Sequence, residues 1–335
     1  MSSQYSQNIQ PNCSNYSQYK SRICLGLCCI NTELRERKKF PVFNSRTCIR
    51  KNFTVDKAKE LALQNVRDLP ETMTWNYDNN INCFRLSSDI FPHFTDTETE
   101  KYNIDFAEED LIWAGGLARA LNQRVLMHPG QYNQVGAQNK KIFEKTVEDL
   151  EHHANILDTM GIDKDGVLIV HGGGTYGDKE NTKRRWIEQF DDLPTNVKNR
   201  LVLENCERQY STRDCLDISE ECRIPVVFDF HHYHCQNLIY QKKSPSKEKK
   251  QEEIMDLIPE VIESWQNTDR NRIIMHVSEQ GSGRIGHHSD YIEKIPDEIF
   301  TILDEFPSIT IDLEVEAKMK EKAIMKLYEK YKGLF

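Results

Sequence analysis

Long apolar runs are absent from this sequence, and their absence excludes whole classes of protein. No stretch approaches the roughly 18 consecutive apolar residues that a membrane-spanning helix requires. The N-terminal segment has neither an apolar centre nor a cleavage pattern, so a secretory signal peptide is not expected. We therefore expect a soluble intracellular protein without a membrane partner, and the sequence does not distinguish the nucleus from the cytoplasm.

Paired cysteine motifs are also missing. The chain contains ten cysteines but no CxxC pair, which argues against a zinc ribbon or a thioredoxin-like site. Several cysteines, such as Cys24 and Cys83, lie inside strand-like runs. This placement favours reduced, buried thiols in a reducing compartment.

An excess of positive charge is the third absence. The net charge is −9, whereas proteins that bind nucleic acid usually carry a surplus of lysine and arginine. The total charge does not settle the question, because divalent cations held by carboxylates would reverse the sign of the charge locally.

What is present is a chain large enough for one folded domain with a full core. It has 335 residues, of which 38% are hydrophobic and 29% charged. Residues 1–21 are polar without periodicity, which predicts a disordered arm, and residues 22–335 are predicted to form a single domain. The lysine-rich segment 241–253 is predicted to be a solvated loop.

Short apolar runs alternate with helix-length segments over most of the chain. The predicted strands cover 23–30 and 82–88 and then the six runs that end at His128, His171, Glu204, Asp229, His276 and Glu316. The predicted helices cover 54–75, 105–122, 138–160, 181–198, 211–222, 250–266, 289–304 and 317–333. Eight strands alternating with eight helices predict a TIM (β/α)8 barrel. An open doubly wound sheet is the alternative, but it would spread the strand ends along a line instead of around one mouth.

The six later strands each stop at a residue that can bind a metal ion. The expected ligands are His128, His171, Glu204, Asp229, His232, His276 and Glu316, with His288 as a candidate eighth. Imidazoles and carboxylates without thiolates suit manganese, zinc or iron. Eight ligands exceed the needs of one ion, so a cluster of two or three ions is expected at the C-terminal mouth of the barrel.

Residues around these ligands have lesser expected roles. His231, His234 and His287 are candidates for orienting the ligands through hydrogen bonds. Glu314 is set aside, because we expect only one of Glu314 and Glu316 to face the barrel interior. A single histidine at a strand end is more often structural than a ligand. The metal interpretation depends on the convergence of many such residues, since buried charges are costly unless they are paired or bind a metal.

Two loops that follow predicted ligands have compositions suited to nucleic acid. Pro129 and Gly130 form a tight turn that projects Gln131 and Tyr132, an amide and a ring that can contact a base edge and a base face. An ordinary surface loop explains this pattern equally well. The glycines at 172–174 allow close approach to a phosphate, with Lys179 as a point charge, although a glycine triplet alone is weak evidence.

Eight motifs together resemble one known family. They are RLSS with FPH (85–93), HPGQY (128–132), EHHANILDTMG (151–161), HGGGTYGDK (171–179), RLVLEN (200–205), PVVFDFHH (225–232), HVSEQ (276–280) and HHSDYI (287–292). From about residue 23 to about residue 320 the chain resembles the UV damage endonuclease family, which is similar to the endonuclease IV apurinic-site nucleases.

The resemblance implies a TIM barrel with a manganese cluster, in which Mg²⁺, Zn²⁺ or Co²⁺ could substitute. It implies a monomeric endonuclease that incises damaged duplex DNA immediately 5′ to UV photoproducts and other distorting lesions. The family's metal ligands would fall on the eight residues named above, and its DNA contacts at the lesion on Gln131, Tyr132 and Asn31. The residues expected to act in catalysis are Glu204, Asp229, Glu316 and Lys179.

The sequence departs from the family pattern at three positions and leaves other activities open. Leu27 stands where a tyrosine is frequent, Cys206 where an acidic residue follows LEN, and Ile274 where a lysine commonly precedes the seventh-strand histidine. The alternatives are an apurinic-site endonuclease with the same metals, a metal-dependent sugar isomerase, and a damage sensor that no longer cleaves.

Overall fold

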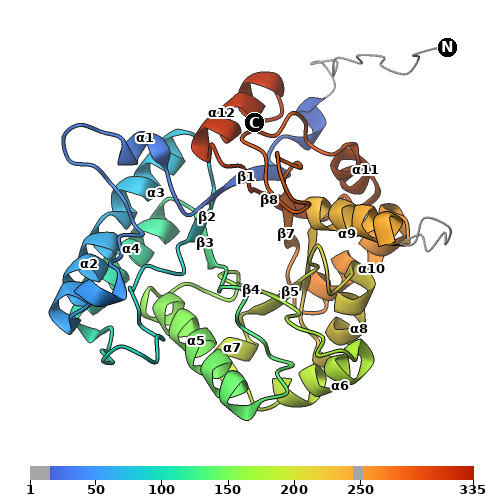
Figure 1. Cartoon of the computed structure of the whole chain (residues 1–335). Helices are drawn as coiled ribbons and strands as arrows, with labels where there is room; N and C mark the ends of the chain where they lie inside the picture. Colours follow the sequence, from blue (N-terminus) through green and yellow to red (C-terminus); the bar gives the residue numbers. More distant parts are fainter. Residues whose placement is uncertain (1–15, 244–251) are drawn as a thin grey trace.

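The computed structural model describes residues 16–243 and 252–335, and within these ranges eight parallel strands close into a barrel (Figure 1). The strands are β1 (Ile23–Cys28), β2 (Cys83–Leu86), β3 (Arg124–Met127), β4 (Leu168–His171), β5 (Leu201–Glu204), β6 (Val226–Asp229), β7 (Arg272–Val277) and β8 (Thr310–Val315). Strand β1 pairs with β2 on one side and with β8 on the other, so the sheet is closed. The predicted TIM barrel is confirmed, and the open sheet is ruled out.

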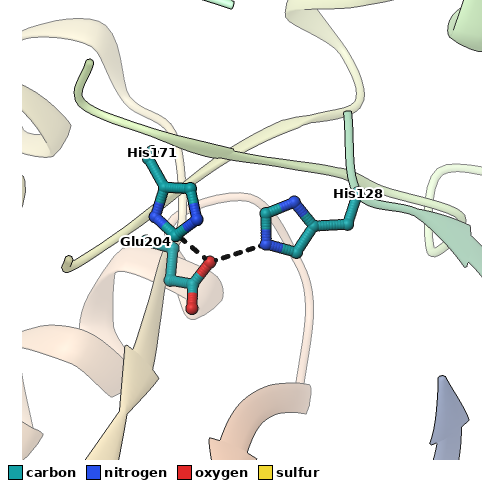
Figure 2. A group of neighbouring side chains, drawn as sticks. All are labelled: His128, His171 and Glu204. Carbon is teal, nitrogen blue, oxygen red and sulfur yellow. Dashed lines mark hydrogen bonds and ion pairs between the residues drawn. The ribbon is translucent and has the colours of Figure 1, made fainter. Parts of the chain in front are cut away.

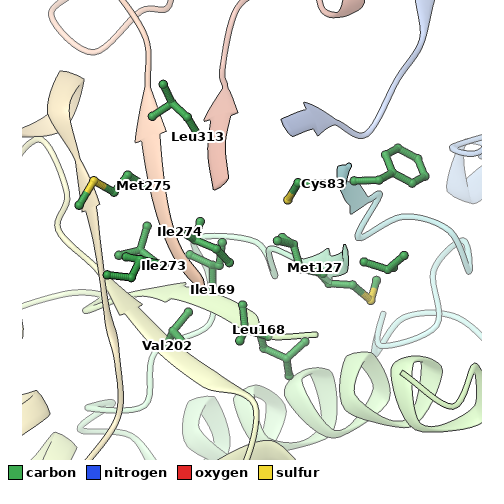
Figure 3. Close-up of a cluster of buried hydrophobic side chains, with 14 of the residues drawn as sticks. Cys83, Met127, Leu168, Ile169, Val202, Ile273, Ile274, Met275 and Leu313 are labelled. Carbon is green, nitrogen blue, oxygen red and sulfur yellow. The ribbon is translucent and has the colours of Figure 1, made fainter. Parts of the chain in front are cut away.

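The strands form where apolar and β-branched residues run together. Every residue of β4, β5 and β6 is buried, because one face of each strand lines the barrel and the other packs against helices. The register pairs Leu168 with Leu201 and Ile169 with Val202. Figure 3 shows Leu168 and Ile169 of β4, Val202 of β5 and Ile274 of β7 in the buried core. This packing fixes the direction in which each strand end points.

Charged residues occupy the opposite, N-terminal end of the barrel. Asp312 of β8 is 1% exposed, and its Oδ2 lies 3.0 Å from Arg124 Nη1 and 2.7 Å from Arg272 Nε. These ion pairs connect β3, β7 and β8 at a depth where an unpaired carboxylate would be costly. Ion pairs as well as apolar packing therefore fill the N-terminal end of the barrel interior.

Helices surround the barrel in Figure 1. The α-helices are α1 (Thr32–Arg35), α2 (Val55–Arg67), α3 (Leu69–Asp78), α4 (Glu108–Ala120), α5 (Lys140–Thr159), α6 (Lys179–Phe190), α7 (Thr195–Lys198), α8 (Thr212–Cys222), α9 (Phe230–Lys243), α10 (Ile254–Gln266), α11 (Asp297–Glu305) and α12 (Glu321–Lys330). Short 3₁₀ turns, η1 (Tyr16–Tyr19), η2 (Arg50–Asn52) and η3 (Asp105–Ala107), supplement them.

Several predicted helices are present but divided or shortened. The helix predicted from Thr54 starts as expected, since the Thr54 hydroxyl accepts a hydrogen bond from Lys57 N, but it breaks at Asp68 into α2 and α3. The division between α2 and α3 is explained by Pro70 at the start of α3, and the division between α6 and α7 by Pro194 directly before α7. Helix α11 starts later than predicted because Pro296 directly precedes it. Proline lacks the N–H that would continue a helix, and it disfavours helical geometry in the residue before it.

Helix α9 was missed. It follows β6 directly, and its apolar residues do not recur with a helical period, so the one local signal is Asp229, whose Oδ1 caps the helix by accepting a hydrogen bond from His232 N at 2.7 Å. Together with the divided helices it makes the prediction of eight helices wrong within the described residues. The predicted loop at 241–253 is helical up to Lys243, and residues 244–251 lie outside the described residues.

The prediction of a disordered arm over residues 1–21 is wrong at its C-terminal end. Tyr19 is buried, its hydroxyl donates to Asp304 Oδ2 at 2.8 Å, and its ring lies 5.3 Å from that of Phe300. Tyr16 packs on the same ring at 4.9 Å. Residues 1–15 lie outside the described residues, and the domain boundary at residue 22 stays a prediction.

Among the helices in the described ranges, none combines the length and the apolar character needed to cross a bilayer.

Candidate metal centre

The side chains at the ends of β3 to β8 meet in the mouth of the barrel. Three groups have ligand atoms that all lie within 4.8 Å of one another: His128, His171 and Glu204; His128, His276 and Glu316; and Glu204, Asp229 and His232. His288, in the loop after β7, places Nε2 3.7 Å from Glu316 Oε2. The structure therefore brings together all eight residues predicted as ligands.

Glu204 is the centre of this cluster and is fully buried. Its Oε2 lies 2.8 Å from His128 Nε2 and 3.6 Å from His171 Nδ1. Figure 2 shows these two histidines beside Glu204. Its Oε1 lies 3.0 Å from His276 Nδ1 and 3.3 Å from His232 Nδ1. Because its two oxygens face different pairs of imidazoles, Glu204 has the geometry of a carboxylate that can connect two metal positions.

The other carboxylates complete the cluster from β6 and β8. Asp229 Oδ2 lies 3.3 Å from His232 Nδ1 and 3.9 Å from His276 Nδ1. Glu316 Oε1 lies 3.7 Å from His276 Nδ1. His232 and His276 therefore each face more than one carboxylate, which gives a connected network instead of isolated pairs.

Burial and neighbouring charges raise the pKa of some of these groups and lower the pKa of others. Burial raises the pKa of Asp229 to about 7 and lowers the pKa of His171 to about 4. Burial also opposes ionisation of Glu204, but His171 and His276 outweigh it and hold the pKa of that carboxyl well below its usual range. Opposed shifts in one buried cluster are characteristic of a functional site.

The chemistry of the donor set fits divalent metal ions. Asp229 Oδ2 and His171 Nδ1 are buried and have no hydrogen-bond partner among the described residues. A buried polar atom left unsatisfied costs about 1–3 kcal/mol, and a metal ion bound between such atoms would remove this cost. The structure therefore supports a divalent metal centre, and the identity of the ion belongs to the proposal below.

Glu314 also belongs to the centre, which corrects the expectation that it points away. It is fully buried, and its Oε2 lies 2.8 Å from His276 Nε2. Residues two apart in a strand point to the same face, so Glu314 and Glu316 both face the barrel interior. The expectation was wrong because it applied to these two residues an alternation that holds only between adjacent ones. Glu314 contacts one ring nitrogen of His276 while the other faces Glu204, and so orients that ligand.

Arg85 is a site residue that the sequence interpretation did not identify. It lies on β2, and its Nη1 is 2.6 Å from Glu316 Oε1 and 3.5 Å from Glu314 Oε2. A charged residue inside a short buried strand needs a buried partner, and this was the available signal. Arg85 holds both β8 carboxylates in place.

The loop between β3 and α5 carries the two predicted DNA-contacting residues, Gln131 and Tyr132, and both are exposed. The Tyr132 hydroxyl donates to Asp149 Oδ1 at 3.3 Å, and Asn133 Nδ2 donates to Asp149 Oδ2 at 2.7 Å. A Cβ on Gly130 would lie 2.5 Å from Tyr132 Cε1, so the ring is packed on the bare Gly130 backbone. Asp149 of α5 therefore anchors this loop beside the metal centre.

Asn31 and Lys179 are placed differently from Gln131 and Tyr132. Asn31 is 4% exposed, and its Oδ1 accepts a hydrogen bond from Leu34 N, which caps α1. Lys179 begins α6, and its Nζ donates to Asp214 Oδ2 at 2.8 Å. In this structure one acts as a helix cap and the other in an ion pair, so a DNA contact by Asn31 and a catalytic role for Lys179 stay predictions.

Of the three histidines expected to orient ligands, His231 contacts one directly. Its ring centroid lies 5.5 Å from that of His288, and Cys235 Sγ lies 3.5 Å from His231 Nε2. His287 contacts the Ser282 carbonyl, and His234 packs beside a tyrosine ring. None of the three forms a hydrogen bond to a predicted ligand among the described contacts, so an orienting role stays a prediction.

The three departures from the family pattern are all buried. Leu27 and Ile274 are fully buried, and Cys206 is 9% exposed with its sulfur accepting hydrogen bonds from the backbone of residues 209 and 210. Ile274 lies two positions before His276 and faces the same side of β7. It therefore supplies an apolar layer directly beneath the metal centre.

A closed barrel with a histidine and carboxylate cluster at its mouth defines a class of metal-binding barrel enzymes. Comparison with known proteins narrows this class. Residues 23–334 match the family model described as UV-endonuclease UvdE. The chain belongs to the UV-damage endonuclease family.

Individual relatives agree with the family match. The chain is 35% identical over 324 residues to the UV-damage endonuclease of Schizosaccharomyces pombe, a match that covers 92% of this chain and 50% of the relative. It therefore spans about half the length of that relative. It is also 35% identical over 317 residues to an Acanthamoeba polyphaga mimivirus protein whose name assigns it to the same group, covering 92% and 91% of the two chains.

Solved structures show the same fold. The crystal structure of SacUVDE is 26% identical, with a TM-score of 0.76 over 92% of this chain and 97% of that one. Endonuclease IV from Thermus thermophilus is 10% identical, with a TM-score of 0.54 over 92% and 98%, and this likeness concerns the fold alone.

Proposed function

We propose that this protein incises damaged duplex DNA immediately 5′ to UV photoproducts and other helix-distorting lesions, leaving a 3′-hydroxyl and a 5′-phosphate. One observation carries the proposal: the turn that supplies the ligand His128 also supplies the exposed Gln131 and Tyr132. The residues that contact the lesion and a ligand of the metal ions that catalyse hydrolysis would then lie on the same turn.

Selectivity would arise from the cost of extruding the lesion. A photoproduct weakens stacking and pairing, so less free energy is needed to bend the duplex and draw the damaged nucleotides toward the barrel mouth. Tyr132 can stack on an exposed base and Gln131 can hydrogen-bond a base edge, neither of which requires a particular sequence.

The centre would hold two or three manganese ions, as the mixed nitrogen and oxygen donors suggest. When bound, such ions lower the pKa of water and stabilise the charge on a phosphate undergoing displacement. The protein's own residues hold the positions: Glu204 connects two groups of imidazoles, and Arg85 and Glu314 fix Glu316 and His276. All the ligands come from one chain, which supports action as a monomer.

The direct test is incision of a 5′-labelled duplex that contains one cyclobutane pyrimidine dimer, with Mn²⁺ present. We expect one cut immediately 5′ to the dimer and none in the undamaged duplex. Glu204→Gln should reduce the rate at least a thousandfold, because it removes the central charge. Glu220→Gln, at an exposed position on α8, should cut normally.

A duplex with a single abasic site is included as the rival substrate. Incision of the abasic duplex alone would contradict the proposal and favour an apurinic-site endonuclease. Metal binding without any incision would instead favour the non-cleaving sensor.

A further inference from the structure

A basic loop, which we define as residues 35–53, stands out from the rest of this acidic chain. It contains seven positively charged residues and one negatively charged residue, in a protein whose net charge is −9. The positive residues are Arg35, Arg37, Lys38, Lys39, Arg46, Arg50 and Lys51. A local reversal of charge on this scale requires an explanation.

The basic loop leads from α1 to the start of α2, on the side of the barrel where the strands end. It is firmly attached on its inner side. Arg46 Nη1 lies 2.7 Å from Asp68 Oδ2, and Asn65 bonds both the backbone N–H and the carbonyl of Arg46. The Cys48 carbonyl lies 2.6 Å from His93 Nε2. These contacts fix the path of the loop without using its lysines.

The outer side of the loop carries charge that is not neutralised. Lys38, Lys39 and Lys51 are exposed, and none of them forms an ion pair with any residue in the described ranges. Between them, Phe40 is 88% exposed and has a φ of +55°. A bulky residue in this backbone conformation is uncommon and clusters at binding sites.

The loop borders the residues proposed to contact the lesion. A cavity of about 400 Å³ is lined by Thr47 and Arg50 of the basic loop and by Tyr132, and its lining also includes the carboxylates Asp89, Asp96, Glu98 and Asp149. The loop and Tyr132 therefore border one common cavity. Lys38, Lys39 and Lys51 do not line it, so they would meet phosphates outside its acidic lining.

We propose that the basic loop binds the sugar-phosphate backbone of the duplex next to the lesion, with Lys38, Lys39 and Lys51 neutralising phosphates and Phe40 contributing an apolar contact. This inference rests on the proposed function and adds to it a binding surface outside the metal centre. A phosphate backbone is favoured as partner by charge complementarity and by the cavity shared with Tyr132.

The test compares two triple variants that change the net charge equally. One is Lys38→Gln/Lys39→Gln/Lys51→Gln. The matched control is Lys20→Gln/Lys164→Gln/Lys332→Gln, whose exposed lysines lie before β1, before β4 and after α12, at the end of the barrel opposite the mouth. Binding of an undamaged 30-base-pair fluorescent duplex is measured between 50 and 200 mM NaCl, after confirming equal melting temperatures.

We expect the basic-loop variant to bind at least tenfold more weakly at 50 mM NaCl. The slope of log K against log [NaCl] should become shallower by about 2 to 3, since each lost phosphate contact removes about 0.9. Incision of the dimer duplex at saturation should stay within about twofold of the unmodified protein, with the loss seen in KM.

A slope and an affinity equal to those of the control would overturn the inference. The inference would also be contradicted if the basic-loop variant lost binding to anionic phosphatidylserine vesicles but bound the duplex normally. The loop would then be a membrane-binding surface. Failure of the proposed function is recognised separately, because the unmodified protein would then not incise the dimer duplex.

Phe40 provides a second, independent measurement. Phe40→Ala should weaken duplex binding about three- to tenfold without changing the salt slope, because a ring contact releases no counterions. A change of slope in this variant, or no loss of affinity, would contradict the role assigned to Phe40.

Discussion

His152 shows at the residue scale how burial, aided by the nearby His153 and Lys101, sets the protonation of a side chain. It lies on α5, 5% exposed, with its ring stacked on Phe94 at a centroid distance of 3.5 Å. Its Nε2 has no hydrogen-bond partner among the described residues. Burial therefore lowers the pKa of His152 well below its ordinary value, and the ring is neutral in the folded protein.

This neutral histidine predicts a loss of stability in acid. Below pH of about 6.5 the unfolded chain binds a proton at this position and the folded chain does not, so the stability contributed by neutral His152 falls as the pH falls. The loss approaches about 1.4 kcal/mol per pH unit for one such group. His152→Phe and His152→Gln should both show a flatter decline in unfolding free energy between pH 6.5 and 5, measured by urea denaturation.

The paired variants separate charge from packing. Phenylalanine keeps the stack on Phe94 and glutamine removes it, so their absolute stabilities should differ while their pH slopes agree. Slopes equal to that of the unmodified protein would show that His152 is protonated in the folded state.

At the scale of elements, the loop after β3 is defined by contacts to the helix that follows it. Asp149 of α5 accepts hydrogen bonds from Tyr132 and Asn133, and the Tyr132 ring packs on Gly130. This arrangement places the ring before any DNA is bound, which lowers the conformational entropy lost on binding.

Gly130→Ala should displace the Tyr132 ring, because the new methyl group would occupy its position. We expect KM for the dimer duplex to rise about tenfold, with kcat changed less than about threefold. Asp149→Asn should act in the same direction but more weakly. Steady-state incision kinetics measure both effects.

Gly116→Ala is the matched control, since a Cβ there would meet only the tip of Arg119 at 3.9 Å. If Gly130→Ala has the same KM as this control, the position of the Tyr132 ring does not matter for lesion binding.

At the scale of the whole molecule, barrel closure decides the site. The eight predicted ligands lie on or after six strands, with His232 in the first turn of α9, and no two neighbouring strands in the described ranges hold the cluster alone. The carboxylates converge on a buried space where they repel one another unless cations are present. Metal ions bound in this space would therefore stabilise the whole fold.

Removal of the ions should lower the melting temperature. At a free Mn²⁺ concentration a hundredfold above its Kd, bound metal stabilises the folded state by about 2.7 kcal/mol, or roughly 4 °C for a chain of this size. Differential scanning calorimetry after EDTA treatment and readdition of Mn²⁺ measures this difference. Glu204→Gln should show a smaller Mn²⁺-dependent shift, whereas an EDTA-treated protein with an unchanged melting temperature would contradict a resident metal centre.

Much of this arrangement could be predicted before the structure was known. Runs such as RLVLE and VLIVH end at ligand residues, and local composition is sufficient to identify a buried parallel strand and its end. The eight strands and the convergence of the eight residues are confirmed, and their role as metal ligands stays a prediction. Helix α9 was missed because its apolar residues do not repeat with a helical period, and because Asp229, which caps its N-terminus, was interpreted only as a strand end and a metal ligand.

The strand periodicity, the types of the predicted ligands and the family follow from the amino-acid order alone, because each depends on residues near one another along the chain. Three contacts needed the folded barrel: Glu314 with His276, Arg85 with the β8 carboxylates, and the basic loop with Tyr132 around one cavity. These contacts join residues far apart in sequence, and closure of the barrel alone sets the distances between them.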